Sequence, residues 1–114
     1  MPKKQQDKVL TALAGEYYVA AELCRRGYVA SLTLKNYPKV DIFALDPATQ
    51  RQTTIQVKTT RGGRSRPFFF VPENASDLGG VFVFVVLPVG SAEGYEVFSV
   101  PAAEVERRSV AGRT

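Results

Sequence analysis

The chain has 114 residues, of which 45% are hydrophobic and 23% charged, a composition typical of a folded domain rather than of a disordered segment. Its net charge of +4 favours polyanionic partners weakly. With one cysteine and no histidine, the chain excludes an internal disulfide, a histidine-ligated zinc site and a serine-histidine-aspartate triad. Any metal must then be held by oxygen atoms, which suits a hard ion such as Mg²⁺.

No segment has the pattern of a membrane span or an export signal. The N-terminal stretch MPKKQQDK is charged, and no signal-type apolar block follows it. The longest apolar run, VFVFVVLPV from Val81, is too short to cross a bilayer, and its β-branched and aromatic residues indicate a buried strand. Together with the single cysteine, Cys24, these features predict one domain over residues 1–114 in the reducing cytoplasm, away from membranes.

The first half of the chain has the pattern of a helix followed by three strands. A helix is predicted from about Gln6 to Arg26, with Gly27 where a C-terminal cap belongs. Its apolar stripe, at three- and four-residue spacing, consists of Val9, Leu13, Ala20, Leu23 and Cys24. The turn-forming segments that follow separate three predicted strands, at 28–34, 40–45 and 52–60.

The second half alternates loops with further strands. The basic loop RGGRSRP (61–67), the apolar run FFFV and a segment with room for a helical turn come first, and a buried strand over 81–88 follows. A strand over 95–100 comes next, and Pro101 stands at the first turn of a predicted closing helix. The phenylalanines in the apolar runs are expected in the core. This order predicts an α/β fold with a central mixed sheet and flanking helices.

Two polar residues interrupt the predicted central strand IQVKTT (55–60). Because side chains alternate along a strand, Gln56 and Lys58 point to one face while Val57 points to the other. A solvated edge strand guarded by charges would give the same pattern, so the pair alone is a weak signal.

The preceding strand supplies a carboxylate that would face this pair. If 40–45 and 52–60 form an antiparallel hairpin closed by the residues 47–50, the numbers of facing residues add up to 97. That register places Asp41 directly opposite Gln56. The aspartate and the two polar residues of IQVKTT are therefore expected to converge.

A second carboxylate lies on the apolar stripe of the predicted helix. Glu16 falls between Leu13 and Ala20, where an unpaired charge would be costly to bury. It therefore needs a partner or a metal at that position. The alternative is a helix rotated so that Glu16 borders solvent and Tyr17 is buried instead.

These residues stand in three stretches whose order resembles that of a known superfamily. GEYYVAAELCRRGY (15–28), KVDIFALD (39–46) and IQVKTT look like the motifs of the PD-(D/E)XK nucleases, most similar to small Holliday-junction-resolvase-like and restriction-endonuclease-like members. The resemblance covers about residues 14–61, and the second half agrees only in general character. It implies a restriction-endonuclease-like α/β/α sandwich with an αβββαβ core, and Mg²⁺-dependent hydrolysis of DNA in which Mn²⁺ can substitute.

The resemblance also implies roles position by position. Asp41 matches the principal metal ligand, Gln56 the acid of the (D/E)XK triplet, and Lys58 its lysine. Glu16 matches the helical acid that helps hold the metal or its water. The backbone carbonyl of Val57 is expected as a further metal ligand, whereas the lysine would position the attacking water or stabilise the transition state.

Two positions depart from the superfamily pattern. Val40 stands where the proline of the PD pair belongs, and Gln56 replaces an acid. A glutamine oxygen can bind a hard cation, but it brings no negative charge. This departure leaves a second interpretation open: a nuclease-fold module that binds DNA with little or no catalysis, or a subunit of a larger nuclease complex.

The basic loop after IQVKTT carries the residues expected to grip DNA. Arg61, Arg64 and Arg66 can bind phosphate oxygens in a bidentate way beside glycines that let the backbone approach, and Lys35 and Lys39 would extend this surface. A solvated turn is the alternative. Such contacts carry no base sequence. Since no helix-turn-helix or zinc finger is present to read bases, a separate specificity protein is one expected partner. The resemblance to small nucleases also implies a homodimer, which could cut two strands.

Overall fold

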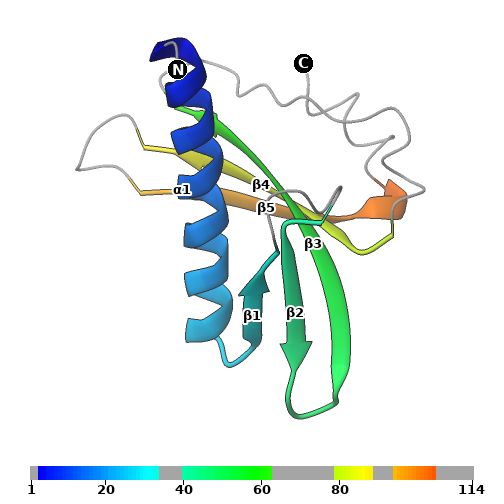
Figure 1. The fold of residues 1–114 in the computed structure, drawn as a ribbon. Coiled ribbons are helices and arrows are strands. Elements are labelled where there is room, and N and C mark those ends of the chain that lie inside the picture. The colour runs from blue at the N-terminus through cyan, green and yellow to red at the C-terminus, as the bar shows by residue number, and fades with distance from the viewer. Residues whose placement is uncertain (1–2, 34–39, 63–78, 89–93, 105–114) are drawn as a thin grey trace.

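One long helix lies against a five-stranded mixed sheet in the computed structural model, which describes residues 3–33, 40–62, 79–88 and 94–104 (Figure 1). The elements in chain order are α1 (Lys3–Arg25), β1 (Val29–Leu32), β2 (Ile42–Asp46), β3 (Arg51–Arg61), β4 (Val81–Leu87), β5 (Glu96–Pro101) and a 3₁₀ turn (Ala102–Glu104). Strands β1, β2 and β3 are antiparallel, β4 runs parallel to β3, and β5 is antiparallel to β4. The predicted α/β fold with a mixed sheet is confirmed at this level.

The C-terminal end of α1 is capped as predicted. Gly27 adopts a left-handed conformation with φ of 96°, which glycine tolerates because it lacks a Cβ atom. The N–H of Tyr28 donates to the carbonyl of Leu23 at 3.0 Å, and the N–H of Gly27 donates to that of Cys24 at 3.0 Å. This pair of bonds is the Schellman motif, and it turns the chain directly into β1.

The face that α1 presents to the sheet differs from the predicted apolar stripe. The buried positions are Gly15 and Val19, whereas Val9 is 38% exposed and Cys24, expected in the core, is also exposed. Two members of the predicted stripe do pack against the core, Ala20 and Leu23. The stripe is therefore confirmed in part, and it lies at the border of the packed face rather than at its centre. The physical reason is that a glycine allows the closest approach to the sheet, yet it contributes nothing to a hydrophobic pattern.

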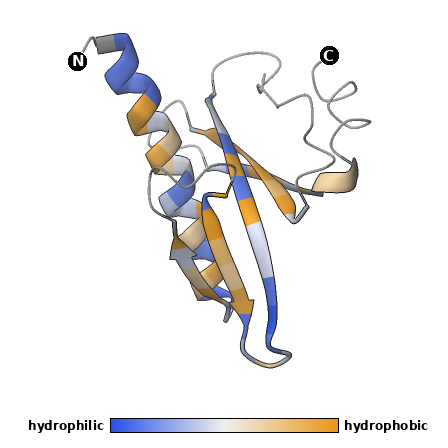
Figure 2. Ribbon diagram, turned by 45° about the vertical axis from the view of Figure 1, so that its right-hand side comes forward, coloured by the Kyte–Doolittle hydropathy of each residue, from blue (hydrophilic) through white to orange (hydrophobic). Residues whose placement is uncertain are grey.

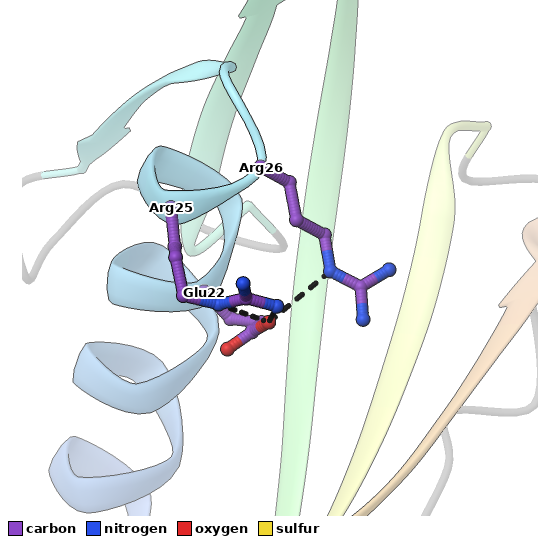
Figure 3. A network of polar contacts seen from close by, with 3 residues as sticks. All are labelled: Glu22, Arg25 and Arg26. Atoms are coloured by element: carbon purple, nitrogen blue, oxygen red, sulfur yellow. Dashed lines mark hydrogen bonds and ion pairs between the residues drawn. The ribbon is translucent and has the colours of Figure 1, made fainter.

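Glu22 forms a small ionic network with Arg25 and Arg26 near the C-terminal end of α1 (Figure 3). The Oε1 atom of Glu22 accepts hydrogen bonds from the Nε of Arg25 at 2.9 Å and from the Nε of Arg26 at 3.1 Å. These bonds, first that of Arg25 and then that of Arg26, hold the pKa of Glu22 below its ordinary value. Both arginines are largely in solvent, so the network contributes little to stability, although cations suit this end of a helix.

The β2–β3 hairpin has the register predicted from its turn length. Pairing runs from Ile42 opposite Ile55 to Asp46 opposite Arg51, so the numbers add up to 97 as expected. The turn 47–50 is held by Asp46, whose carbonyl accepts the N–H of Gln50 at 2.7 Å. Since one slip of register would exchange the two faces of a strand, this agreement fixes which side chains share a face.

The pairing of β3 is staggered between its two neighbours. Strand β2 pairs with the first part of β3, from Arg51 to Ile55, and β4 pairs with the second part, from Ile55 to Arg61. Ile55 is the residue of β3 that has a partner on both sides. Beyond Ile55, β3 is no longer paired with β2 but remains paired with β4.

Each face of the sheet has its own hydrophobic cluster. On the face that packs against α1, here called the helix face, the buried residues are Val19, Ile42, Ala44, Ile55, Val57, Val83, Val85 and Leu87. On the opposite face, the far face, Phe82 and Ala102 are 1% exposed and pack with Phe84 and Val100. The predicted core position of Phe82 is confirmed. Figure 2 shows hydrophobic colouring along β2 and β4 and hydrophilic bands within β3.

Several predictions concern the chain ends and loops. Strand β5 continues through Pro101, and the residues after it form a 3₁₀ turn over Ala102–Glu104 at the point where the closing helix was predicted to start. The turn at 35–38, the apolar run at 68–71, most of the predicted helical turn and the chain after residue 104 lie outside the described residues. In the part of the chain that is described, no helix is both long and apolar enough to span a membrane.

Candidate functional site

The candidate site lies along one edge of β3. Regular pairing with β2 ends at Ile42 opposite Ile55, yet β3 continues to Arg61. Within the described ranges, no strand pairs with the β2 side of β3 past this point. We call this stretch, from Gln56 to Arg61 on the β2 side, the open edge.

Asp41 stands at the beginning of the open edge and is held there from two strands. Its N–H donates to the carbonyl of Ile55 at 2.9 Å, and its carboxylate oxygen Oδ2 accepts the N–H of Val57 at 2.7 Å. On its other side, its carbonyl accepts the N–H of Thr33 at 2.9 Å. Two of these bonds hold the backbone of this half-buried residue and the third holds its carboxylate, the kind of support that keeps a site preorganised.

The backbone of Val57 faces the same place. The N–H and C=O groups of one residue in a strand point to the same side of that strand. Because the N–H of Val57 points to Asp41, its carbonyl oxygen is also directed to the open edge. The Asp41 carboxylate and the Val57 carbonyl oxygen thus lie on the same side of β3, while the Val57 side chain is buried on the helix face.

Gln56 brings a polar atom that has no partner among the described residues. Its Oε1 atom is buried and accepts no hydrogen bond. Its paired neighbour in β4, Phe82, is an apolar residue of the far-face cluster. An unsatisfied buried acceptor costs about 1–3 kcal/mol, so a site that retains one requires an explanation. A bound cation or its water would provide the missing partner.

Lys58 lies on the far face together with Gln56, as the alternation predicted. It is half-buried and pairs with Phe84 of β4, an aromatic neighbour against which its aliphatic stem can pack. The Asp41 carboxylate is bonded to Val57, the residue between Gln56 and Lys58, so all three predicted site residues adjoin the same short stretch of β3.

Glu16 approaches from the other layer. Tyr18, two residues later on α1, stacks on Tyr95 with ring centroids 4.0 Å apart and planes 5° from parallel. Tyr95 directly precedes β5, so Tyr18 marks the β4–β5 side of the helix. Residues two apart on a helix point about 200° apart. The half-buried Glu16 therefore lies on the flank of α1 that faces β1 and β2, the side of the open edge.

The alternative for this helix, with Tyr17 buried in place of Glu16, does not hold. Tyr17 is 58% exposed on the outer side of α1.

Of the residues predicted to bind DNA, only some are among the described residues. Arg61 is exposed at the end of β3, where the N–H of Gly62 donates to the carbonyl of Leu87 at 2.8 Å. The other four basic residues expected in this role, Arg64, Arg66, Lys35 and Lys39, lie outside the described residues.

The donor set that the edge offers consists of hard oxygens. Among the described residues, no three Asp, Glu, Cys or His side chains come together. An amide oxygen and a backbone carbonyl are not of these types, so Asp41, Gln56 and Val57 still provide one carboxylate and two neutral oxygens. Such a set fits Mg²⁺ or Mn²⁺ and suits neither zinc nor a soft metal.

One residue that matters for this geometry was missed from the sequence. Gly15 is buried against Thr59 of β3, and a Cβ atom added to it would overlap the Thr59 hydroxyl oxygen. The available signal was its position in the middle of a helix, where glycine costs about 1 kcal/mol relative to alanine and calls for a reason. Close approach of two backbones is such a reason.

Comparison with protein-family models found no matching family, and comparison with curated proteins found no matching relative. A function for this chain is therefore inferred from its own residues and their geometry.

Proposed function

We propose that the chain is a metal-dependent DNA endonuclease of the PD-(D/E)XK type, with Mg²⁺ as its cofactor and Mn²⁺ as a substitute. The observation that carries the proposal is the arrangement at the open edge. The Asp41 carboxylate is fixed to the Val57 backbone, the buried Gln56 oxygen has no partner in the described structure, and Lys58 stands beside it. The topology of α1 and β1–β4 is compatible with a restriction-endonuclease-like fold.

In this proposal, each residue has a distinct task. Asp41, the Gln56 amide and the Val57 carbonyl would hold the ion, and Glu16 would hold a second ion or a metal-bound water from the helix side. The ion, when bound, polarises the scissile phosphate and makes water a better nucleophile at neutral pH. Lys58 would orient the attacking water and offset the negative charge that builds on the phosphate. Arg61 would bind the DNA backbone next to the scissile phosphate.

The proposal is tested by cleavage of labelled DNAs, among them linear duplex and a four-way junction, with Mg²⁺, Mn²⁺ or EDTA. We expect metal-dependent cutting that Lys58→Met lowers by about 10²-fold or more, because one preorganised charge at the transition state is lost. Methionine is close to lysine in length and lacks its charge, so the change removes the ammonium group from the strand position paired with Phe84. Cutting that persists in EDTA, or that Lys58→Met leaves unchanged, would contradict this assignment.

A second prediction concerns Gln56, where a substitution should raise the affinity for Mg²⁺. Gln56→Glu adds a full negative charge to the proposed ligand set, and we expect Mg²⁺ to bind about tenfold more tightly, equivalent to about 1.4 kcal/mol. Without metal the new carboxylate is buried unpaired, so the free energy of unfolding should become Mg²⁺-dependent. Titration calorimetry and urea unfolding at several Mg²⁺ concentrations measure the two effects.

The matched control for Gln56→Glu is Gln52→Glu. Gln52 lies on the same strand and the same face, but it is exposed and pairs with Leu45 within the β2–β3 hairpin. An equal gain in Mg²⁺ affinity for both variants would mean that general surface charge is responsible, and Gln56 would not be a ligand.

A second function remains a candidate because of the same glutamine. A site with one neutral side chain in place of an acid holds its cation less tightly, and three acids are not gathered among the described residues. The chain would then be a nuclease-fold module that binds DNA, or a subunit whose partner protein supplies specificity or the missing residues. Binding that weakens with salt, without cleavage under any metal, would favour this function.

A further inference from the structure

Gly15 of α1 lies directly against Thr59 of β3, with no room for a side chain between them. An added Cβ atom on Gly15 would overlap the Thr59 hydroxyl oxygen, and it would stand 2.9 Å from Cβ and 3.0 Å from Cγ2 of the same residue. Contacts below 3.0 Å between such atoms essentially never occur, so a larger residue at position 15 requires α1, β3 or the Thr59 side chain to shift.

Each of the two residues in this contact carries a free-energy cost of its own. Glycine in the middle of a helix destabilises that helix, and the Thr59 hydroxyl oxygen is buried with no hydrogen-bond partner among the described residues. Neither feature improves packing by itself. Both are explained if the distance between α1 and β3 at this level has to be short.

The residues next to Gly15 and Thr59 indicate why the distance between α1 and β3 is short here. Glu16 follows Gly15 on the flank of α1 that faces the β2 side, and Lys58 precedes Thr59 on β3. A helix moves as a rigid rod over one turn, so a displacement of Gly15 away from β3 carries the Glu16 carboxylate away from the open edge by a similar amount. A misplacement of about 1 Å can lower a catalytic rate by about 10²-fold.

We infer that Gly15 is a positioning residue, which sets the reach of Glu16 to the open edge through its contact with Thr59. This inference rests on the proposed function, since it assigns Glu16 a part in the nuclease site. It differs from a purely structural role because the loss caused by a larger residue is expected to act through the Glu16 carboxylate, which the variants below test directly.

The test is a set of variants whose DNA cleavage and Mn²⁺ affinity are measured at a temperature where all of them are folded. We expect Gly15→Ala to lower kcat by about 10²-fold with little change in KM, and to weaken Mn²⁺ binding in calorimetry. Adding Thr59→Ala removes the hydroxyl oxygen that the new methyl group would overlap, so the double variant should recover part of both losses. It also provides a folded form of the substitution if Gly15→Ala alone fails to fold.

Two further variants separate positioning from stability. In a Glu16→Gln background, Gly15→Ala should cause no additional loss of kcat, because its effect acts through the carboxylate that is already gone. Val19→Ala, which removes packing from the same buried helix face, should lower the unfolding midpoint while kcat stays near the wild-type value.

The outcomes distinguish the inference from the proposed function. If the wild type neither cuts DNA nor binds Mn²⁺, both are overturned. If the wild type cuts and Gly15→Ala retains its kcat and Mn²⁺ affinity, or loses as much kcat in the Glu16→Gln background as alone, the inference alone is overturned.

Discussion

Asp41→Asn is expected to lower metal-dependent DNA cleavage by about 10³-fold or more while leaving the fold intact. The asparagine oxygen can still accept the N–H of Val57, so the link between the two strands is retained. What is lost is the one negative charge that the strand residues of the site contribute, and with it most of the attraction for a divalent cation. Cleavage rates and Mg²⁺ titrations of the purified variant measure both consequences.

The matched control is Asp46→Asn, at the other end of β2. The Asp46 carboxylate accepts the N–H of Ala48 at 2.9 Å in the hairpin turn, far from the open edge. It changes the net charge of the protein by the same amount, so general effects on DNA binding cancel in the comparison. A similar loss of activity in both variants, or full activity of Asp41→Asn, would remove Asp41 from the site.

Phe82→Ala is expected to have the largest effect on stability, about 3–5 kcal/mol. Phe82 is 1% exposed and is one of the largest fully buried side chains, and it packs with Ala102, Phe84 and Val100 on the far face. A domain of this size is stable by about 5–15 kcal/mol, so the loss is a large share of the total. Urea unfolding followed by circular dichroism measures it as a lower midpoint with an unchanged slope.

Phe98→Ala provides the comparison for this substitution. Phe98 is in the neighbouring strand β5 but is 49% exposed, so its removal should change the free energy of unfolding by no more than about 1 kcal/mol. If the two variants are equally destabilised, the far face is packed differently from the arrangement described above.

The β2–β3 hairpin and its polar face could be predicted from the sequence alone. Alternation along IQVKTT sorts Gln56 and Lys58 from Val57, and a turn of four residues fixes the register without knowledge of the rest of the fold. Both depend on local geometry with a period of two, which an amino-acid sequence displays directly.

The orientation of α1 could not be predicted in this way. A hydrophobic pattern reports which side chains avoid water, whereas the contact that orients this helix is made by Gly15, which has no side chain. The predicted stripe therefore included Ala20 and Leu23, which pack against the core, but it also included the exposed Cys24 and missed the buried glycine. A backbone contact between segments far apart in the sequence produces no periodic pattern of residues that could reveal it.

The hydrogen bond of Asp41 to the backbone of Val57 was also beyond the sequence. Facing strands predicted Asp41 opposite Gln56, but regular pairing stops at Ile42, and the carboxylate itself takes the place of the next ladder partner. Ile42 is the first residue of β2, and where a strand begins depends on the chain that leads into it, so strand boundaries are the least certain part of a sequence pattern.

The stagger of β3 has a mechanical consequence for its two ends. Since Ile55 is the residue paired on both sides, a twisting motion between the β1–β2 and β4–β5 parts of the sheet would pivot there. Gln56 lies one residue, about 3 Å, from that pivot, whereas Arg61 lies at a lever arm of about 20 Å. The same rotation would thus displace Gln56 very little and Arg61 several times more. One strand would then hold the proposed metal ligands in place while the basic residue at its end moves to follow a bound partner.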